Sequence, residues 1–79
     1  MKLTVYSKDG CPFCYKIEQV LDLINAQYKI YKLNEDFTKD EFYAKFGKGS
    51  TFPQVILNDE KQLGGCTETI KYLKETKII

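Results

Sequence analysis

The chain contains no histidine among its 79 residues. Histidine is the commonest general base at neutral pH and the commonest protein ligand for transition metals. Its absence removes most familiar acid–base and metal chemistry, so any reaction that this chain performs is expected to depend on its three cysteines.

The chain also lacks a strong excess of charge and a long apolar run. Twelve basic residues against eleven acidic residues leave a net charge of +1, so nothing indicates a nucleic-acid or anionic-membrane partner. No apolar run approaches the roughly 20 residues that span a bilayer, and residues 1–4 lack the apolar core of a secretory signal. We therefore expect a cytoplasmic protein with no membrane partner.

Repeats, low-complexity segments and linkers are absent as well. A chain of 79 residues has room for one small core, and 43% hydrophobic with 29% charged residues is ordinary for a folded protein. We expect a single domain over residues 1–79 and a monomer.

The three cysteines are too few, and odd in number, for a disulfide-rich secreted domain. Two of them form Cys11-Pro12-Phe13-Cys14, which follows a predicted strand and opens a predicted helix. At a helix start the first sulfur can lie beside unpaired backbone N–H groups, which favour the thiolate, and the thiolate is the nucleophile in disulfide exchange. A closed zinc site needs four ligands, but only Cys66 remains, so we predict a redox dithiol and no metal.

Hydrophobic periodicity predicts the first half of the fold. Residues 2–6 form a strand, and residues 12 to about 26 form a helix with Ile17, Leu21 and Ile24 on its apolar side. Pro12 suits the first helical position because its missing N–H would have no intrahelical partner. A second strand at residues 28–33 is expected to run parallel to the first through a right-handed crossover.

A second helix is predicted to begin after Thr38. Thr38 and Glu41 match a capping box, Phe37 can pack on Phe42 as a hydrophobic staple, and Gly47 is expected to end the helix as a left-handed cap.

Two short strands at residues 54–58 and 61–63 predict a hairpin, and a last helix over residues 66–76 places Ile70 and Leu73 inward. The order β-α-β-α-β-β-α predicts an α/β fold, a mixed four-stranded sheet flanked by three helices.

Three motifs in their order and spacing, together with Lys8, resemble the glutaredoxin family along the whole chain. They are the dithiol, Thr51-Phe52-Pro53 before a strand, and Gly64-Gly65-Cys66-Thr67 at a helix start. The resemblance implies a thioredoxin-like fold and the reduction of disulfides, above all mixed disulfides between proteins and glutathione. Glutathione would be the co-substrate, with no bound cofactor. Many small glutaredoxins donate electrons to ribonucleotide reductase, which makes that enzyme a possible partner.

The resemblance also implies individual roles. Cys11 would attack the substrate disulfide, and Cys14 would resolve protein disulfides. A cis peptide bond is expected before Pro53, with the backbone of Phe52 pairing with the cysteinyl part of glutathione. The γ-glutamyl carboxylate would bind at the start of the last helix, and Lys8 would contact the glycyl end. The predicted glutathione-binding residues are Lys8, Phe13, Lys48, Thr51, Phe52, Pro53, Gly65, Cys66 and Thr67.

Some of these residues depart from the family pattern or have ordinary alternatives. Phe13 stands where many glutaredoxins have tyrosine, and Thr67 where many have aspartate, so substrate affinity can differ from the family norm. Lys48 is preferred over Lys45 as the basic contact near the end of the second helix, although either can simply favour the helix macrodipole. For Cys66 we expect the backbone, and not the thiol, to take part.

Other functions remain open at this point. A thioredoxin-like donor reduced by a flavin enzyme would share the fold and the thiol chemistry. A carrier of an iron–sulfur cluster or of copper through Cys11 is a non-enzymatic alternative, although glutaredoxins that hold clusters usually lack proline at the position of Pro12. A purely structural domain is the third alternative.

Overall fold

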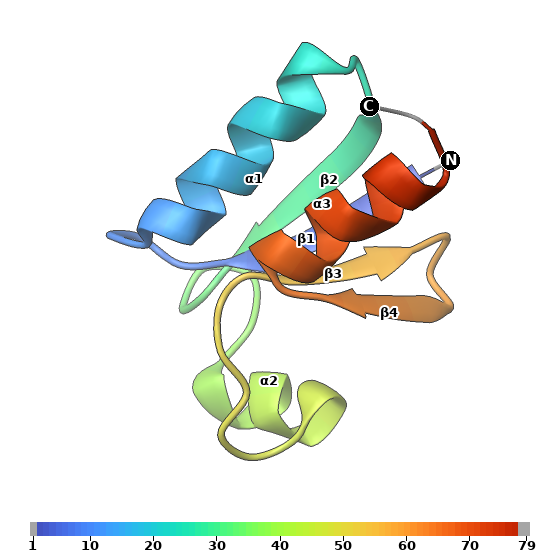
Figure 1. Cartoon of the computed structure of the whole chain (residues 1–79). Coiled ribbons are helices and arrows are strands. Elements are labelled where there is room, and N and C mark those ends of the chain that lie inside the picture. The colour runs from blue at the N-terminus through green and yellow to red at the C-terminus, as the bar shows by residue number, and fades with distance from the viewer. Residues whose placement is uncertain (1, 78–79) are drawn as a thin grey trace.

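The computed structural model describes residues 2–77, and residues 1, 78 and 79 of the predicted domain lie outside the described residues. Its seven elements follow the predicted order (Figure 1). They are β1 (Lys2–Ser7), α1 (Pro12–Leu23), β2 (Gln27–Lys32), α2 (Lys39–Phe46), β3 (Gln54–Leu57), β4 (Lys61–Gly64) and α3 (Cys66–Glu75).

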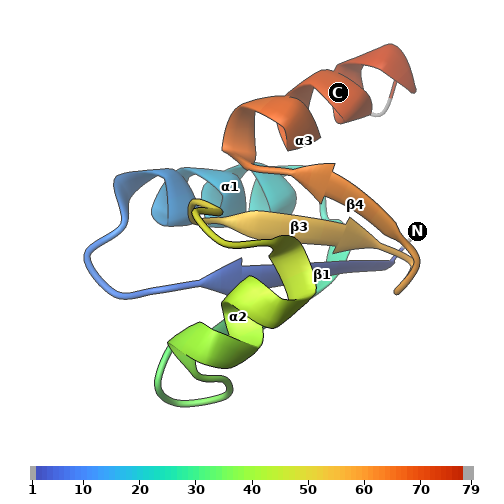
Figure 2. The same ribbon diagram turned by 90° about the horizontal axis from the view of Figure 1, so that it is seen from below.

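The four strands form one mixed sheet in the order β2-β1-β3-β4. β1 pairs with β2 in parallel and with β3 in antiparallel, and β3 pairs with β4 in antiparallel. Helices α1 and α3 cover one face of the sheet and α2 covers the other (Figure 2). The predicted mixed four-stranded sheet with three helices is therefore confirmed, including the parallel crossover.

Helix α1 ends three residues earlier than the periodicity predicts. Its cap is Ile24, and Asn25 adopts a positive φ of 54°. The N–H of Ala26 donates to the carbonyl of Leu21 at 2.9 Å, and the N–H of Asn25 donates to Asp22 at 3.1 Å. These two bonds form a Schellman motif, in which asparagine replaces the usual glycine. Because Ile24 and Ala26 are apolar, the hydrophobic periodicity continues past this point and does not indicate that the helix ends here.

Helix α2 begins as predicted. The N–H of Glu41 donates to the hydroxyl of Thr38 at 3.2 Å, and the N–H of Thr38 donates to the carboxylate of Glu41 at 2.8 Å. The rings of Phe37 and Phe42 stack with centroids 5.8 Å apart, which confirms the staple. Gly47 ends the helix with φ 103° and ψ 148°, so its φ is positive as expected but its ψ lies outside the left-handed helical region.

The sheet separates two hydrophobic layers. The main core lies between the sheet and helices α1 and α3, and Ile17, Leu21 and Leu73 are fully buried there, whereas Ile24 and Ile70 pack against it partly buried. On the opposite face, aromatic rings fill the space between the sheet and α2. These aromatic residues are Tyr6, Phe37, Phe42, Phe46 and Phe52.

Phe52 thereby belongs both to the layer under α2 and to the segment that precedes β3.

Within residues 2–77, no helix has the length and apolar character needed to cross a membrane.

Candidate functional site

The dithiol lies at the N-terminus of α1. Cys11 is the N-cap residue, with φ −105° and ψ 105°, and Pro12 follows it in the first turn of the helix. The N–H of Cys14 donates to the sulfur of Cys11 at 3.2 Å. The two sulfurs are paired as a disulfide, with a Cα–Cα distance of 5.2 Å. When the pair is reduced, the same backbone end favours the anionic form of Cys11.

The two cysteines differ in access. Cys11 borders the larger of two cavities at the site, whereas Cys14 borders neither of them and is 1% exposed. Cys11 is itself only 5% exposed, so the two thiols differ mainly in that Cys11 borders the groove, and attack by Cys11 stays a prediction.

The loop before Cys11 is held by contacts to two elements. The N–H of Gly10 donates to the Tyr15 hydroxyl on α1 at 3.1 Å, and Gly10 has a φ of 72° that favours glycine. Lys32 on β2 lies 3.2 Å from the carboxylate of Asp9. The ammonium of Lys8, in the same loop, lies 5.2 Å from the centre of the Phe52 ring.

The segment before β3 brings Phe52 next to the dithiol. Its peptide bond to the buried Pro53 is cis, as the resemblance implied. Its ring stacks on Phe42 with centroids 4.1 Å apart and planes 10° apart. Among the hydrogen bonds of residues 2–77, none uses the N–H or the C=O of Phe52. Both groups are available to pair with an extended ligand.

The start of α3 packs against this segment. A Cβ built on Gly65 would lie 3.5 Å from the carbonyl of Pro53, which is an ordinary contact distance, and 3.0 Å from the carboxylate at the end of the flexible Glu68 side chain. The Glu68 carboxylate accepts a hydrogen bond from the N–H of Gly65 at 2.8 Å. The N–H groups of Cys66 and Thr67, in the first turn of α3, have no intrahelical partner. This turn therefore presents two free donors at the positive end of a helix, a common arrangement for binding an anion.

These segments meet in a cavity of about 150 Å³. We call it the small cavity, and it is lined by Phe13, the Thr51-Phe52-Pro53 segment and residues 65–68. Of the predicted glutathione-binding residues, only Lys8 and Lys48 are absent from its lining. Glu68 is a lining residue that our sequence reasoning missed, although its position three residues after Gly65 is the spacing of a capping box.

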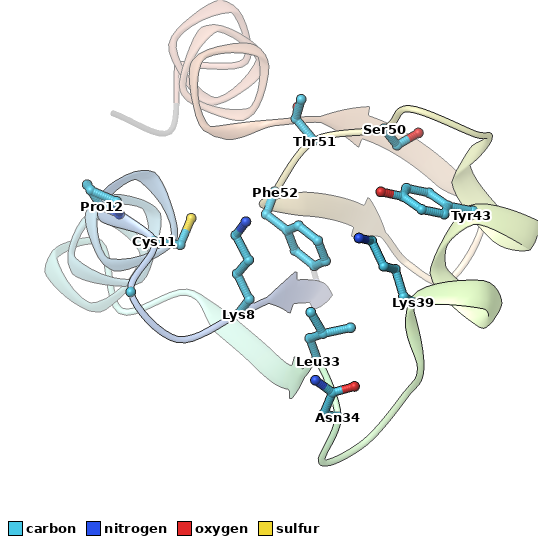
Figure 3. A pocket seen from close by; sticks show the side chains of 11 residues that line it. Lys8, Cys11, Pro12, Leu33, Asn34, Lys39, Tyr43, Ser50, Thr51 and Phe52 are labelled. Atoms are coloured by element: carbon cyan, nitrogen blue, oxygen red, sulfur yellow. The ribbon is translucent and has the colours of Figure 1, made fainter.

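Phe52 also borders a larger groove of about 640 Å³, whose lining residues lie on both sides of its ring (Figure 3). We call it the large groove. Lys8, Cys11 and Phe52 line it together with Lys39 and Tyr43 of α2, neither of which the sequence singled out. No local pattern could have found these two, because they reach the groove only through the packing of α2 on the sheet.

Lys48 is exposed in the turn after α2 and lines neither of these cavities. Its proposed contact with glutathione stays a prediction. Lys39 is the lysine of α2 that lines the large groove.

The third cysteine lies in a different environment from the first two. Cys66 is 5% exposed and packs in the main core, and burial is the largest cause that raises the pKa of its thiol. A buried, protonated thiol is a poor nucleophile. Within residues 2–77 no group of three or more cysteine, aspartate or glutamate side chains is arranged to hold a metal ion.

Comparison with known proteins identifies the family to which the chain belongs. The family model described as Glutaredoxin matches residues 3–62. The chain belongs to the glutaredoxin family. It is 32% identical to glutaredoxin 1 of Rickettsia conorii over 79 residues, an alignment that covers 96% of this chain and 76% of that protein.

Solved glutaredoxins have the same fold. The buckwheat glutaredoxin–glutathione complex superposes with a TM-score of 0.79 at 25% identity, covering 96% of this chain and 71% of that one. Reduced Escherichia coli glutaredoxin superposes with a TM-score of 0.81 at 22% identity over the whole of both chains, which confirms the thioredoxin-like fold. With the Cys11–Cys14 pair in place, this member of the family is a thiol–disulfide oxidoreductase.

Proposed function

We propose that the chain is a glutathione-dependent oxidoreductase that reduces mixed disulfides between proteins and glutathione, and also protein disulfides. The observation that carries this proposal is the small cavity, because it brings two kinds of free backbone group together against Phe13, which lies between the two cysteines of the dithiol. Phe52 offers a donor and an acceptor for strand-like pairing, and the first turn of α3 offers donors for a carboxylate.

Glutathione is a tripeptide with features that match these groups. Its cysteinyl part would pair with the backbone of Phe52, which directs the sulfur toward Cys11. Its γ-glutamyl carboxylate would accept from the N–H groups of Cys66 and Thr67, while the Glu68 carboxylate in the same cavity suits its ammonium group. Lys8 would pair with the glycyl carboxylate. The buckwheat relative in complex with glutathione supports this ligand.

In the proposed reaction, the Cys11 thiolate attacks the glutathionyl sulfur of the mixed disulfide. A new S–S bond joins Cys11 to glutathione, and the substrate protein leaves as a thiolate that takes up a proton. A second glutathione thiolate then attacks the glutathionyl sulfur on Cys11. Glutathione disulfide leaves and Cys11 returns to the thiolate.

Protein disulfides need Cys14. After Cys11 forms a mixed disulfide with the substrate, the thiolate of Cys14 attacks the sulfur of Cys11 and releases the second substrate thiol. The product is the Cys11–Cys14 disulfide, which two glutathione molecules reduce while forming glutathione disulfide. A ribonucleotide reductase is a candidate substrate for this second route.

The proposal is tested by reduction of a small glutathione mixed disulfide in the presence of glutathione, glutathione reductase and NADPH. We expect turnover with this system and little with a flavin-dependent thioredoxin reductase in place of glutathione. Turnover only with thioredoxin reductase would contradict glutathione dependence and favour a thioredoxin-like donor. Coloured protein as isolated, with no turnover in either system, would favour the carrier of a cluster or of copper.

A further inference from the structure

The backbone on the helix side of Cys11 has little freedom. Pro12 follows Cys11, and a residue that precedes proline is restricted to extended conformations. The φ of −105° and ψ of 105° at Cys11 belong to this extended region. The ring of Pro12 also fixes its own φ. The chain between Cys11 and the helix therefore cannot easily turn the sulfur in another direction.

The residue on the other side of Cys11 is the flexible one. Gly10 has a φ of 72°, a conformation that glycine adopts without strain. A Cβ built on Gly10 would meet no neighbouring atom within 4 Å, so no packing around the Cα of Gly10 holds it in place. Figure 3 shows that the sulfur of Cys11 faces Lys8 and Phe52. Rotation about the backbone of Gly10 would move this sulfur away from the start of α1.

Tyr15 on α1 forms hydrogen bonds with both Gly10 and Cys11. Its hydroxyl accepts from the N–H of Gly10 at 3.1 Å, and its own N–H donates to the carbonyl of Cys11 at 3.2 Å. Within residues 2–77 the N–H of Gly10 makes no other hydrogen bond. Tyr15 therefore closes a ring of contacts around the two residues and fixes the conformation that glycine leaves free.

The ion pair in the same loop is a weaker anchor. Lys32 lies 3.2 Å from the carboxylate of Asp9, but the two side chains are 38% and 79% exposed. Exposed ion pairs contribute little to stability, and salt screens them. The hydrogen bond from Gly10 joins two neutral groups, so we expect it to persist at high salt.

Packing and ligand contact do not account for Tyr15. Its side chain is 47% exposed and does not belong to the main core. It lines neither the small cavity nor the large groove, so it lies outside the surfaces that are proposed to bind glutathione. The contact of its hydroxyl with Gly10 is the feature that remains.

We propose that Tyr15 is a positioning residue for Cys11, and that its hydroxyl holds Gly10 so that the sulfur of Cys11 stays against the start of α1. The N–H of Cys14 donates to this sulfur at 3.2 Å, and the helix end favours the thiolate only while the sulfur keeps this place. The proposal goes beyond the proposed function and rests on it in one respect, that Cys11 is the attacking thiol.

The test compares Tyr15→Phe with Tyr72→Phe. Each variant keeps the aromatic ring and loses one hydroxyl, and the hydroxyl of Tyr72 on α3 makes no hydrogen bond within residues 2–77. Both variants retain Lys8, Lys39 and Tyr43, which are the other ionisable side chains that line the large groove with Cys11.

Two measurements are made on the fully reduced proteins. Hydrogen exchange of the Gly10 amide, followed by nuclear magnetic resonance, reports on the contact itself. The pH dependence of alkylation of Cys11 by iodoacetamide, read by mass spectrometry, reports on its consequence. Iodoacetamide is small and needs no binding site, so a change in glutathione binding does not affect this second measurement.

In Tyr15→Phe we expect the Gly10 amide to exchange about two- to tenfold faster, which is the effect of losing one typical hydrogen bond. The midpoint for alkylation of Cys11 should rise by about 0.3 to 1 pH unit, because a tenfold loss of thiolate stabilisation corresponds to about one unit. Tyr72→Phe should match the unmodified protein in both measurements.

Faster exchange at Gly10 with an unchanged midpoint for Cys11 would overturn the proposal, because the contact would then hold the loop without positioning the sulfur. Unchanged exchange in Tyr15→Phe, or equal shifts in the two variants, would overturn it as well. If Cys11 of the unmodified protein titrated as an ordinary cysteine, its role as the attacking thiol would fail, and the proposed function would fail together with the role of Tyr15.

Discussion

Replacement of Cys11 by serine is expected to lower turnover of a glutathione mixed disulfide by at least about 1,000-fold. Removing the nucleophile of a covalent mechanism leaves only binding and positioning to accelerate the reaction. Cys11 borders the large groove, lies at the N-cap of α1 and accepts a hydrogen bond from the N–H of Cys14, so no other thiol has its access and its backbone environment. The measurement is the rate of NADPH consumption with glutathione and glutathione reductase.

Cys14→Ser is the matched control for this prediction. It removes a sulfur from the same helical turn but leaves the attacking group, so it should retain activity toward glutathione mixed disulfides while losing most activity toward protein disulfides. Substantial turnover by Cys11→Ser, or equal losses in both variants, would contradict the division of roles between the two cysteines.

Replacement of Phe42 by alanine is expected to lower the free energy of unfolding by about 3 to 5 kcal/mol. Phe42 is 1% exposed and contacts the rings of Phe37, Phe46 and Phe52. The loss is large because a domain of this size has a total stability of about 5 to 15 kcal/mol. Urea unfolding followed by far-ultraviolet circular dichroism measures it, since the chain has no tryptophan to report by fluorescence.

The same substitution should also weaken substrate binding, because the ring of Phe42 stacks on the ring of Phe52 and holds it in place. Protein that remains folded is expected to need more glutathione mixed disulfide for half-maximal turnover. Leu23→Ala, at a side chain that is 82% exposed, provides the control and should change the free energy of unfolding by less than about 0.5 kcal/mol. A loss of less than about 1 kcal/mol in Phe42→Ala would show that the aromatic layer under α2 is not a major source of stability.

The parts of the fold that could be predicted are those that depend on residues close together in the sequence. The capping box of Thr38 and Glu41 and the staple of Phe37 on Phe42 involve residues only a few positions apart, and the structure reproduces each of them. The dithiol at a helix start is also a local pattern. The end of α1 was not predicted, because the residue that adopts the positive φ there is Asn25 and not a glycine.

The composition of the site was harder to predict because several of its residues meet only through tertiary packing. Lys39 and Tyr43 reach the large groove because α2 packs across the face of the sheet opposite α1. The spacing of residues in the sequence does not predict where on the sheet a helix will pack. By contrast, Phe13, which the resemblance implied as a glutathione-binding residue, is 58% exposed and lines the small cavity.

The central claim is that the backbone at the start of α1 favours the thiolate of Cys11, and the pH dependence of its alkylation tests this most directly. The fully reduced protein is treated with iodoacetamide from pH 4 to pH 10, and the rate at each cysteine is read by mass spectrometry. Because the helix end favours the thiolate, we predict a midpoint for Cys11 below the value of about 8.5 for free cysteine. Cys66, whose pKa burial raises, should react more slowly and only at higher pH. A midpoint for Cys11 at or above about 8.5, or a Cys66 that reacts as fast as Cys11 at pH 7, would contradict the claim.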